Sequence, residues 1–185
     1  MQRKSFGNMQ CPVARGLERV GEWWSILILR DAFAGMTRFD EFQKSLNIAP
    51  NILTRRLTAL VDAGMLERRL YCERPPRFEY VLTERGRDFR PVLISLQSWG
   101  NRHFAPEGLS VMLVDSRTGA AAEPILVDRL TGQTITDATH QNAAGPAAGA
   151  RVKKRLALRK TSPVEQVPAT TTTKSTRRHS ARPKS

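Results

Sequence analysis

The stretch RFDEFQKSLNIAPNILTRRLTALVDAGMLERRLYCERPPRFEYVL, residues 38–82, changes its hydrophobic period once. Its first half repeats apolar side chains every three or four positions, which predicts short helices over residues 39–46 and 51–63. Its second half predicts two strands, residues 65–71 and 78–82, separated by a loop with two consecutive prolines. This order of helix, turn, helix, strand, loop and strand predicts a winged helix-turn-helix.

Further helices flank this stretch. Residues 12–20 place apolar side chains on one face, which predicts a short amphipathic helix. Residues 22–34 are apolar nearly all round, which predicts a helix buried on more than one side. Beyond the strands, Thr83 is expected to cap one longer helix, and Pro91 is expected either to kink this helix or to lie near its first turns. The predicted fold class is therefore α+β and mainly helical, with a two-stranded wing.

The composition divides the chain into three parts. Residues 1–108 hold the predicted winged helix-turn-helix domain. Residues 109–136 contain two short apolar runs, 111–114 and 124–127, which predict a small C-terminal β-hairpin extension. Residues 137–185 are rich in Ala, Gly, Pro, Thr, Lys and Arg, and they predict a low-complexity basic tail that is disordered.

The positive charge of the chain is concentrated at its end. The whole chain has 30 basic and 17 acidic side chains and a formal net charge of +13. Residues 151–185 alone hold eleven basic and one acidic side chain, a net charge of +10, and residues 151–160 could form one basic helix. Such a surplus indicates a polyanionic partner, with nucleic acid as the leading case.

Other features exclude several classes of protein. No apolar run approaches the roughly 18 residues that a membrane span needs. The polar start of the chain does not resemble a signal peptide, so a cytoplasmic protein is expected. Two cysteines and three scattered histidines form neither a disulfide framework nor a zinc pattern. Since no catalytic constellation or phosphate-binding loop is present, no enzyme activity, metal or cofactor is expected.

The predicted helix 51–63 carries side chains suited to reading DNA on its outer face. Arg55 can bond the O6 and N7 atoms of guanine, and Asn51 can bond adenine. Thr54 and Thr58 can reach a phosphate or a thymine methyl group. A solvated helix face is the alternative interpretation, but the complete order of helix, turn, helix and wing favours a DNA-reading helix.

Arginines around this helix are candidates for contacts with the DNA backbone. Arg74 and Arg77 flank the two prolines of the wing, which stiffen the loop; a solvated hairpin tip is the alternative. Arg38 lies at the start of the first helix, where backbone N–H groups favour phosphate. Arg56 lies between the two faces of its helix and is expected to contact a phosphate or a nearby acidic side chain.

Several short motifs follow one another in a fixed order over residues 11–104. Together they resemble HxlR-type bacterial transcriptional regulators, which are relatives of the MarR group. Members often have Ser before the proline that opens the second helix, and this chain has Ala49 there, so one cap is missing. The motifs are CPVA (11–14), LILRD (27–31), RFDEF (38–42), LTRRL (53–57), GMLER (64–68), PPRFEY (75–80) and LTERG (82–86).

The resemblance implies a homodimer that binds double-stranded DNA at a pseudo-palindromic operator. Residues 1–108 then form a DNA-binding and dimerisation domain, with contacts between copies through the N-terminal segment and through Val92, Leu96 and Trp99. The expected function is sequence-specific transcriptional regulation in the bacterial nucleoid, with a small-molecule effector of unknown identity. The alternative is a nucleoid-associated protein that binds nucleic acid non-specifically through its basic tail.

Cys11 matches a cysteine that senses thiol-reactive compounds in some HxlR-type proteins, so the resemblance makes it a candidate redox sensor. Sensing requires thiolate character. The helix that starts at Pro12 is expected to contribute to it, and so is Arg15. The alternative is a small buried apolar residue at the dimer interface. Trp23 and Trp24 are expected in the core or at an interface. The alternative is that their side chains line a pocket for an aromatic effector.

Overall fold

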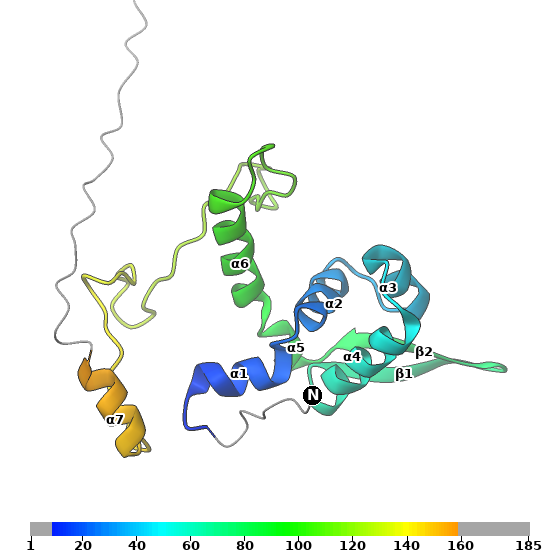
Figure 1. Ribbon diagram of the computed structural model, residues 1–185. Helices are drawn as coiled ribbons and strands as arrows, with labels where there is room; N and C mark the ends of the chain where they lie inside the picture. Colours follow the sequence, from blue (N-terminus) through cyan, green and yellow to red (C-terminus); the bar gives the residue numbers. More distant parts are fainter. Residues whose placement is uncertain (1–8, 159–185) are drawn as a thin grey trace, which may run out of the picture.

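The computed structural model describes residues 9–158 and confirms the predicted winged helix-turn-helix. Helices α2, α3 and α4 form the body, and the β1–β2 hairpin projects from it (Figure 1). Helix α6 leaves the body in another direction, and α7 lies beside α1. The elements are α1 (Pro12–Val20), α2 (Trp23–Phe33), α3 (Phe39–Leu46), α4 (Pro50–Asp62), β1 (Leu66–Glu73), β2 (Pro76–Leu82), α5 (Glu84–Arg87), α6 (Arg90–His103) and α7 (Ala150–Ala157).

The hydrophobic core lies between α2, α3, α4 and the base of the hairpin. Helix α2 contributes from several sides, as its apolar sequence predicts: Ile28 and Leu29 are buried, while Trp24 packs against the core edge. The Trp23 side chain lies outside the core and is 74% exposed. Seven large side chains are at most 1% exposed: Ile28, Leu29, Phe42, Leu53, Leu57, Leu60 and Leu66.

The wing is longer than the sequence predicts. Strands β1 and β2 pair antiparallel from Leu66 opposite Leu82 to Glu73 opposite Pro76. The prediction that two consecutive prolines keep the whole stretch 72–77 out of the sheet is therefore wrong. Pro76 is the first residue of its strand, a position where the missing N–H of proline is tolerated.

The helix predicted to run from Thr83 past Pro91 is divided into α5 and α6. The Thr83 hydroxyl accepts a hydrogen bond from the Gly86 N–H at 3.0 Å and donates one to the Gly64 carbonyl at 2.7 Å. Thr83 therefore caps α5 and links it to Gly64, two residues after the end of α4. Pro91 lies in the first turn of α6, because its ring and its missing N–H do not fit the interior of a helix.

The predicted β-hairpin extension, residues 109–136, pairs differently from the expectation. Its two apolar runs do not pair with each other. Val114 instead bridges Ala121, and Val127 bridges Thr134, so each run pairs with the residues just after its own turn. The reason is local, because each run is followed directly by a tight turn that reverses the chain within a few residues.

The predicted basic helix near the end of the chain is present as α7, within a region expected to be disordered. The Gln10 side-chain oxygen accepts a hydrogen bond from the N–H of Gly149, the residue that precedes α7, at 2.9 Å. Residues 137–158 therefore return to the N-terminal segment, a contact that their composition does not reveal. The remainder of the predicted disordered tail, residues 159–185, lies outside the described residues. Among residues 9–158, no helix combines the length and the apolar character that crossing a membrane requires.

Candidate nucleic-acid interface

Helix α4 separates an inner apolar face from an outer polar face. Its inner side chains Leu53, Leu57 and Leu60 are 0% exposed and join the core. The helical period turns the intervening positions outward. All four residues predicted to contact bases or phosphates from this helix are exposed: Asn51, Thr54, Arg55 and Thr58.

Two side chains in the first turn of α4 form hydrogen bonds with backbone groups of the same turn. Ala49 precedes the helix and supplies no side-chain cap, as expected for Ala at this position. The Asn51 side-chain oxygen accepts from the Ile52 N–H at 2.9 Å, and the Thr54 hydroxyl donates to the Pro50 carbonyl at 2.9 Å. The Arg55 guanidinium makes no ion pair and no side-chain hydrogen bond with any residue in the range 9–158, so it is available to a ligand.

Arg56 contacts a nearby acidic side chain, one of the two contacts predicted for it. Its Nη2 lies 3.1 Å from Oε2 of Glu22, and the two side chains are only 13% and 29% exposed. Arg56 Nε is also buried without a hydrogen-bond partner among the described residues. The ion pair joins the middle of α4 to the residue that precedes α2, so Arg56 positions the helix rather than facing solvent.

The wing and the start of α3 are held together. The Tyr80 N–H donates to the Thr37 carbonyl at 2.7 Å, and Arg38 forms an isolated β-bridge with Glu79. The Arg38 guanidinium stacks over the ring of Tyr71, 4.9 Å from its centroid. Arg38 therefore lies against the middle of the wing, where Glu79 pairs with Arg69.

Further arginines lie in the wing. Arg74 and Arg77 are exposed near the turn of the hairpin, and Arg77 pairs with Cys72, the residue that follows the Tyr71 covered by Arg38. Arg68, which sequence reasoning missed, stacks over the ring of Phe78 at 3.4 Å from its centroid. These two residues lie on opposite strands, so only the register of the hairpin reveals the contact. Arg69 instead forms an ion pair with Glu67 at 2.9 Å.

Cys11 precedes α1, and its thiol contacts a guanidinium from the other end of the chain. Arg155 Nη1 donates to Cys11 Sγ at 3.3 Å. This hydrogen bond, together with the backbone N–H of Ala14, holds the pKa of the Cys11 thiol below its ordinary value. The predicted partner is therefore wrong: Arg15 Nε donates to the Met9 carbonyl at 2.8 Å instead.

Replacing Arg155 with Met is expected to raise the pKa of Cys11 and slow its alkylation near neutral pH, because less thiolate is present. The rate of iodoacetamide modification should be measured across a pH series in a Cys72→Ser background, so that one described thiol reacts. Arg15→Met is the matched control and should leave the profile unchanged. An Arg155→Met profile identical to that of the parent protein would contradict the assignment.

Helices α1 and α6 leave apolar side chains uncovered in the single chain. The predicted contact residues Val92, Leu96 and Trp99 follow the helical period along one face of α6 and are 52%, 44% and 54% exposed. On α1, Val13 and Leu17 are also exposed. Apolar stripes of this kind are typical of helices that pack against another surface.

The helix-turn-helix here consists of α3 and α4, and α4 has an exposed polar face. This arrangement, followed by a two-stranded wing, defines a class of DNA-binding proteins. The model of the HxlR-like helix-turn-helix family matches residues 19–108. The chain belongs to the HxlR-like helix-turn-helix family. Its relatives are transcriptional regulators and not enzymes, so the protein is a DNA-binding transcriptional regulator.

Three relatives illustrate the similarity. An uncharacterised HTH-type transcriptional regulator of Mycobacterium tuberculosis, Rv3095, is 38% identical over 141 residues, which cover 76% of this chain and 89% of the relative. The structure of PA1374 from Pseudomonas aeruginosa, assigned as a transcription factor, is 53% identical with a TM-score of 0.58 and covers 79% of this chain and 100% of its own. The structure of PA1607, assigned likewise, is 39% identical with a TM-score of 0.68 and covers 76% and 99%.

Proposed function

We propose that the protein is a sequence-specific regulator that binds a pseudo-palindromic operator as a homodimer. The observation that carries this proposal is the position of Arg55: it is exposed on the outer face of α4 and pairs with no other residue among 9–158, while Leu53 and Leu57 on the inner face are fully buried. The N-terminal half of α4 enters a major groove, where Arg55 bonds guanine and Asn51 bonds adenine. Thr54 and Thr58 contact the phosphates or thymine methyl groups beside them.

Three arginines hold the DNA backbone in this proposal. Arg74 and Arg77 at the end of the wing lie along the phosphates, or in the minor groove, beside the major groove that α4 enters. Arg38 contacts a phosphate from beside the middle of the wing, where Tyr71 supports its guanidinium. These contacts fix the register of the protein on DNA and leave the choice of sequence to α4.

The homodimer is proposed from the uncovered faces of α1 and α6. Val92, Leu96 and Trp99 meet the same face of a second copy, since a two-fold interface uses one patch twice. Two copies of α4 then enter successive major grooves about 34–36 Å apart. The proposed place of action is the cytoplasm, at the bacterial nucleoid.

The dimer is also proposed to respond to thiol-reactive compounds or another small effector. An electrophile that bonds to Cys11 Sγ removes the thiolate that Arg155 stabilises. The tie between α1 and α7 is then weakened. Since α1 also contacts α4, a change at Cys11 lies one helix away from the DNA-reading surface.

Binding driven by the basic end of the chain is the second candidate function. The net charge of +10 in residues 151–185 supports it, and α7 exposes Arg151, Lys153 and Lys154. A protein that binds in this way neutralises phosphates without distinguishing base sequences. Discrimination between DNA sequences therefore separates the two candidates.

The test is fluorescence anisotropy of the purified protein on the DNA upstream of its own coding sequence and on scrambled DNA of equal length. The upstream DNA is expected to bind at least about 1,000-fold more tightly at roughly 150 mM salt. Equal binding to both, falling steeply with salt, would favour the second candidate function.

Removing residues 151–185 is expected to lower the dependence of affinity on salt concentration while keeping the preference for upstream DNA. Fewer phosphates are neutralised, so fewer counterions are released on binding. The same anisotropy series measures both quantities. Loss of the preference along with the salt dependence would assign sequence reading to the basic end of the chain.

A further inference from the structure

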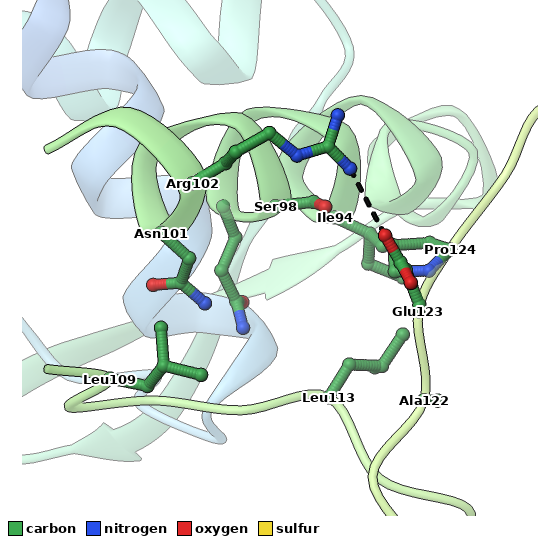
Figure 2. Close-up of a pocket in the computed structure, with 10 residues that line it drawn as sticks. Ile94, Ser98, Asn101, Arg102, Leu109, Leu113, Ala122, Glu123 and Pro124 are labelled. Atoms are coloured by element: carbon green, nitrogen blue, oxygen red, sulfur yellow. Dashed lines mark hydrogen bonds and ion pairs between the residues drawn. The ribbon is translucent and has the colours of Figure 1, made fainter. Parts of the chain in front are cut away.

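The extension, residues 109–136, is fastened along one face of α6. Asn101 and Gln97 both donate side-chain hydrogen bonds to the Val111 carbonyl, at 2.9 and 3.4 Å. Arg102 Nη2 lies 3.1 Å from Oε1 of Glu123, and this ion pair attaches a second part of the extension to α6. Figure 2 shows this ion pair among the residues that line a pocket, with Leu109 and Leu113 on the side opposite α6. The pocket has a volume of about 300 Å³. The extension is therefore an ordered addition to the dimerisation helix.

Two turns of the same kind give the extension its shape. Residues 113–119 read LVDSRTG and residues 126–132 read LVDRLTG. In each turn the aspartate carboxylate accepts from a backbone N–H two residues later: Asp115 from Arg117 at 2.8 Å, and Asp128 from Leu130 at 2.9 Å. The Arg117 N–H holds the pKa of the Asp115 carboxyl below its ordinary value. The Thr131 hydroxyl, which donates to Asp128 at 2.7 Å, lowers the pKa of the Asp128 carboxyl together with the Leu130 N–H. The repeated turns fix the directions in which the apolar side chains between them point.

The extension leaves many of its large apolar side chains exposed. Nine of them are between 42% and 88% exposed. The nine are Leu109, Val111, Met112, Val114, Ile125, Leu126, Val127, Leu130 and Ile135.

Part of this surface continues the apolar face of α6. One hollow of about 210 Å³ lies between α6 and the extension: Ser95, Ser98, Trp99 and Arg102 line it from α6, and Pro124, Ile125 and Leu126 line it from the extension. We name this site, Trp99 with residues 124–126, the Trp99 hollow. Trp99 also belongs to the face with Val92 and Leu96, and its ring packs edge-on against Phe104 at 4.9 Å between centroids. The hollow therefore continues the apolar face of α6 at Trp99, while Ser95, Ser98 and Arg102 supply its polar side.

The charges of the extension do not suit nucleic acid. Residues 109–136 hold three acidic and two basic side chains in a chain whose net charge is +13. Glu123 and Asp115 are paired with arginines, at 3.1 and 3.7 Å. An apolar surface with a paired polar rim fits another protein surface.

We propose that the Trp99 hollow is a second contact of the homodimer and receives an apolar side chain from the second copy. This inference rests on the proposed dimerisation through α6. A two-fold interface places the same elements of both copies near each other, so a surface continuous with the α6 face meets the second copy. The extension thereby enlarges the interface beyond the helices and makes the dimer tighter.

The test is sedimentation velocity on full-length protein with Ile125→Ser and Leu126→Ser combined. The dimer dissociation constant is expected to rise on the order of 10–100-fold, because two apolar side chains no longer fill the interface. Leu130→Ser is the matched control, since Leu130 is 88% exposed at a turn and does not line the hollow. It should leave the dissociation constant unchanged.

Leu96→Ser separates the inference from the dimer on which it rests. If Leu96→Ser dissociates the dimer while the Ile125 and Leu126 double variant keeps the parental constant, the hollow is not a contact and the α6 dimer stands. If the parent protein is monomeric throughout, the proposed dimer fails as well.

Amide hydrogen exchange on the unmodified protein gives a second readout that does not depend on any variant folding. The amides of residues 125–127 should exchange more slowly at concentrations where the dimer forms than in dilute solution. Equal exchange at both concentrations, with dimer formed at the higher one, would overturn the inference.

Discussion

Arg55→Ala is expected to cost about 1–3 kcal/mol of specific binding free energy at each half-site and to relax base preference there. The guanidinium is exposed on the outer face of α4 and has no partner among the described residues, so its removal disturbs no internal contact. Its bidentate bond to guanine is lost in both copies of the proposed homodimer. The total effect on operator binding is therefore about twice the single-site value.

Anisotropy on upstream and scrambled DNA measures this effect directly, and Arg77→Ala is the matched control. Arg77 is also an exposed arginine but lies in the wing, where a phosphate contact weakens all sequences alike. The ratio of the two affinities should fall with Arg55→Ala and stay nearly constant with Arg77→Ala. Equal losses on both DNAs with Arg55→Ala would refute its role in reading bases.

Phe42→Ala is expected to lower the free energy of unfolding by about 3–5 kcal/mol. Phe42 comes from α3, is 0% exposed and lies in the core between α2 and α4. Truncation leaves a cavity that the packed helices cannot fill. Since a domain is usually stable by only about 5–15 kcal/mol, this change removes a large share of the total.

Urea unfolding followed by circular dichroism gives the change in free energy at fixed protein concentration. Leu130→Ala serves as the control, because Leu130 is 88% exposed in the extension and should alter stability by less than about 0.5 kcal/mol. A loss below about 1 kcal/mol for Phe42→Ala would mean that the core of α2, α3 and α4 is not the main support of the fold.

The sequence alone determined the two helices of the helix-turn-helix and their inner and outer faces. The period of Leu53, Leu57 and Leu60 predicts the buried side of α4, and with it the exposure of Asn51 and Arg55. This prediction succeeds because helix periodicity and burial are local properties: a side chain three or four positions along the chain lies on the same face. The family motifs are local in the same sense, since each is a short run of consecutive residues.

Contacts between distant segments were decided only by the tertiary structure. Composition predicts a disordered basic end, yet Arg155 donates to Cys11, 144 positions away, and displaces the expected Arg15. Arg56 could have met a phosphate or an acid, and only the packing of α4 against the start of α2 selects Glu22.

The extension shows the same limit in a different way. Two apolar runs indicate strands, but a run does not specify its partner, and each pairs with the residues after its own turn. Periodicity reports which side of an element is apolar. The partner of a charge, a thiol or a strand depends on how the elements pack, because that packing brings residues far apart in the chain within a few ångströms of each other.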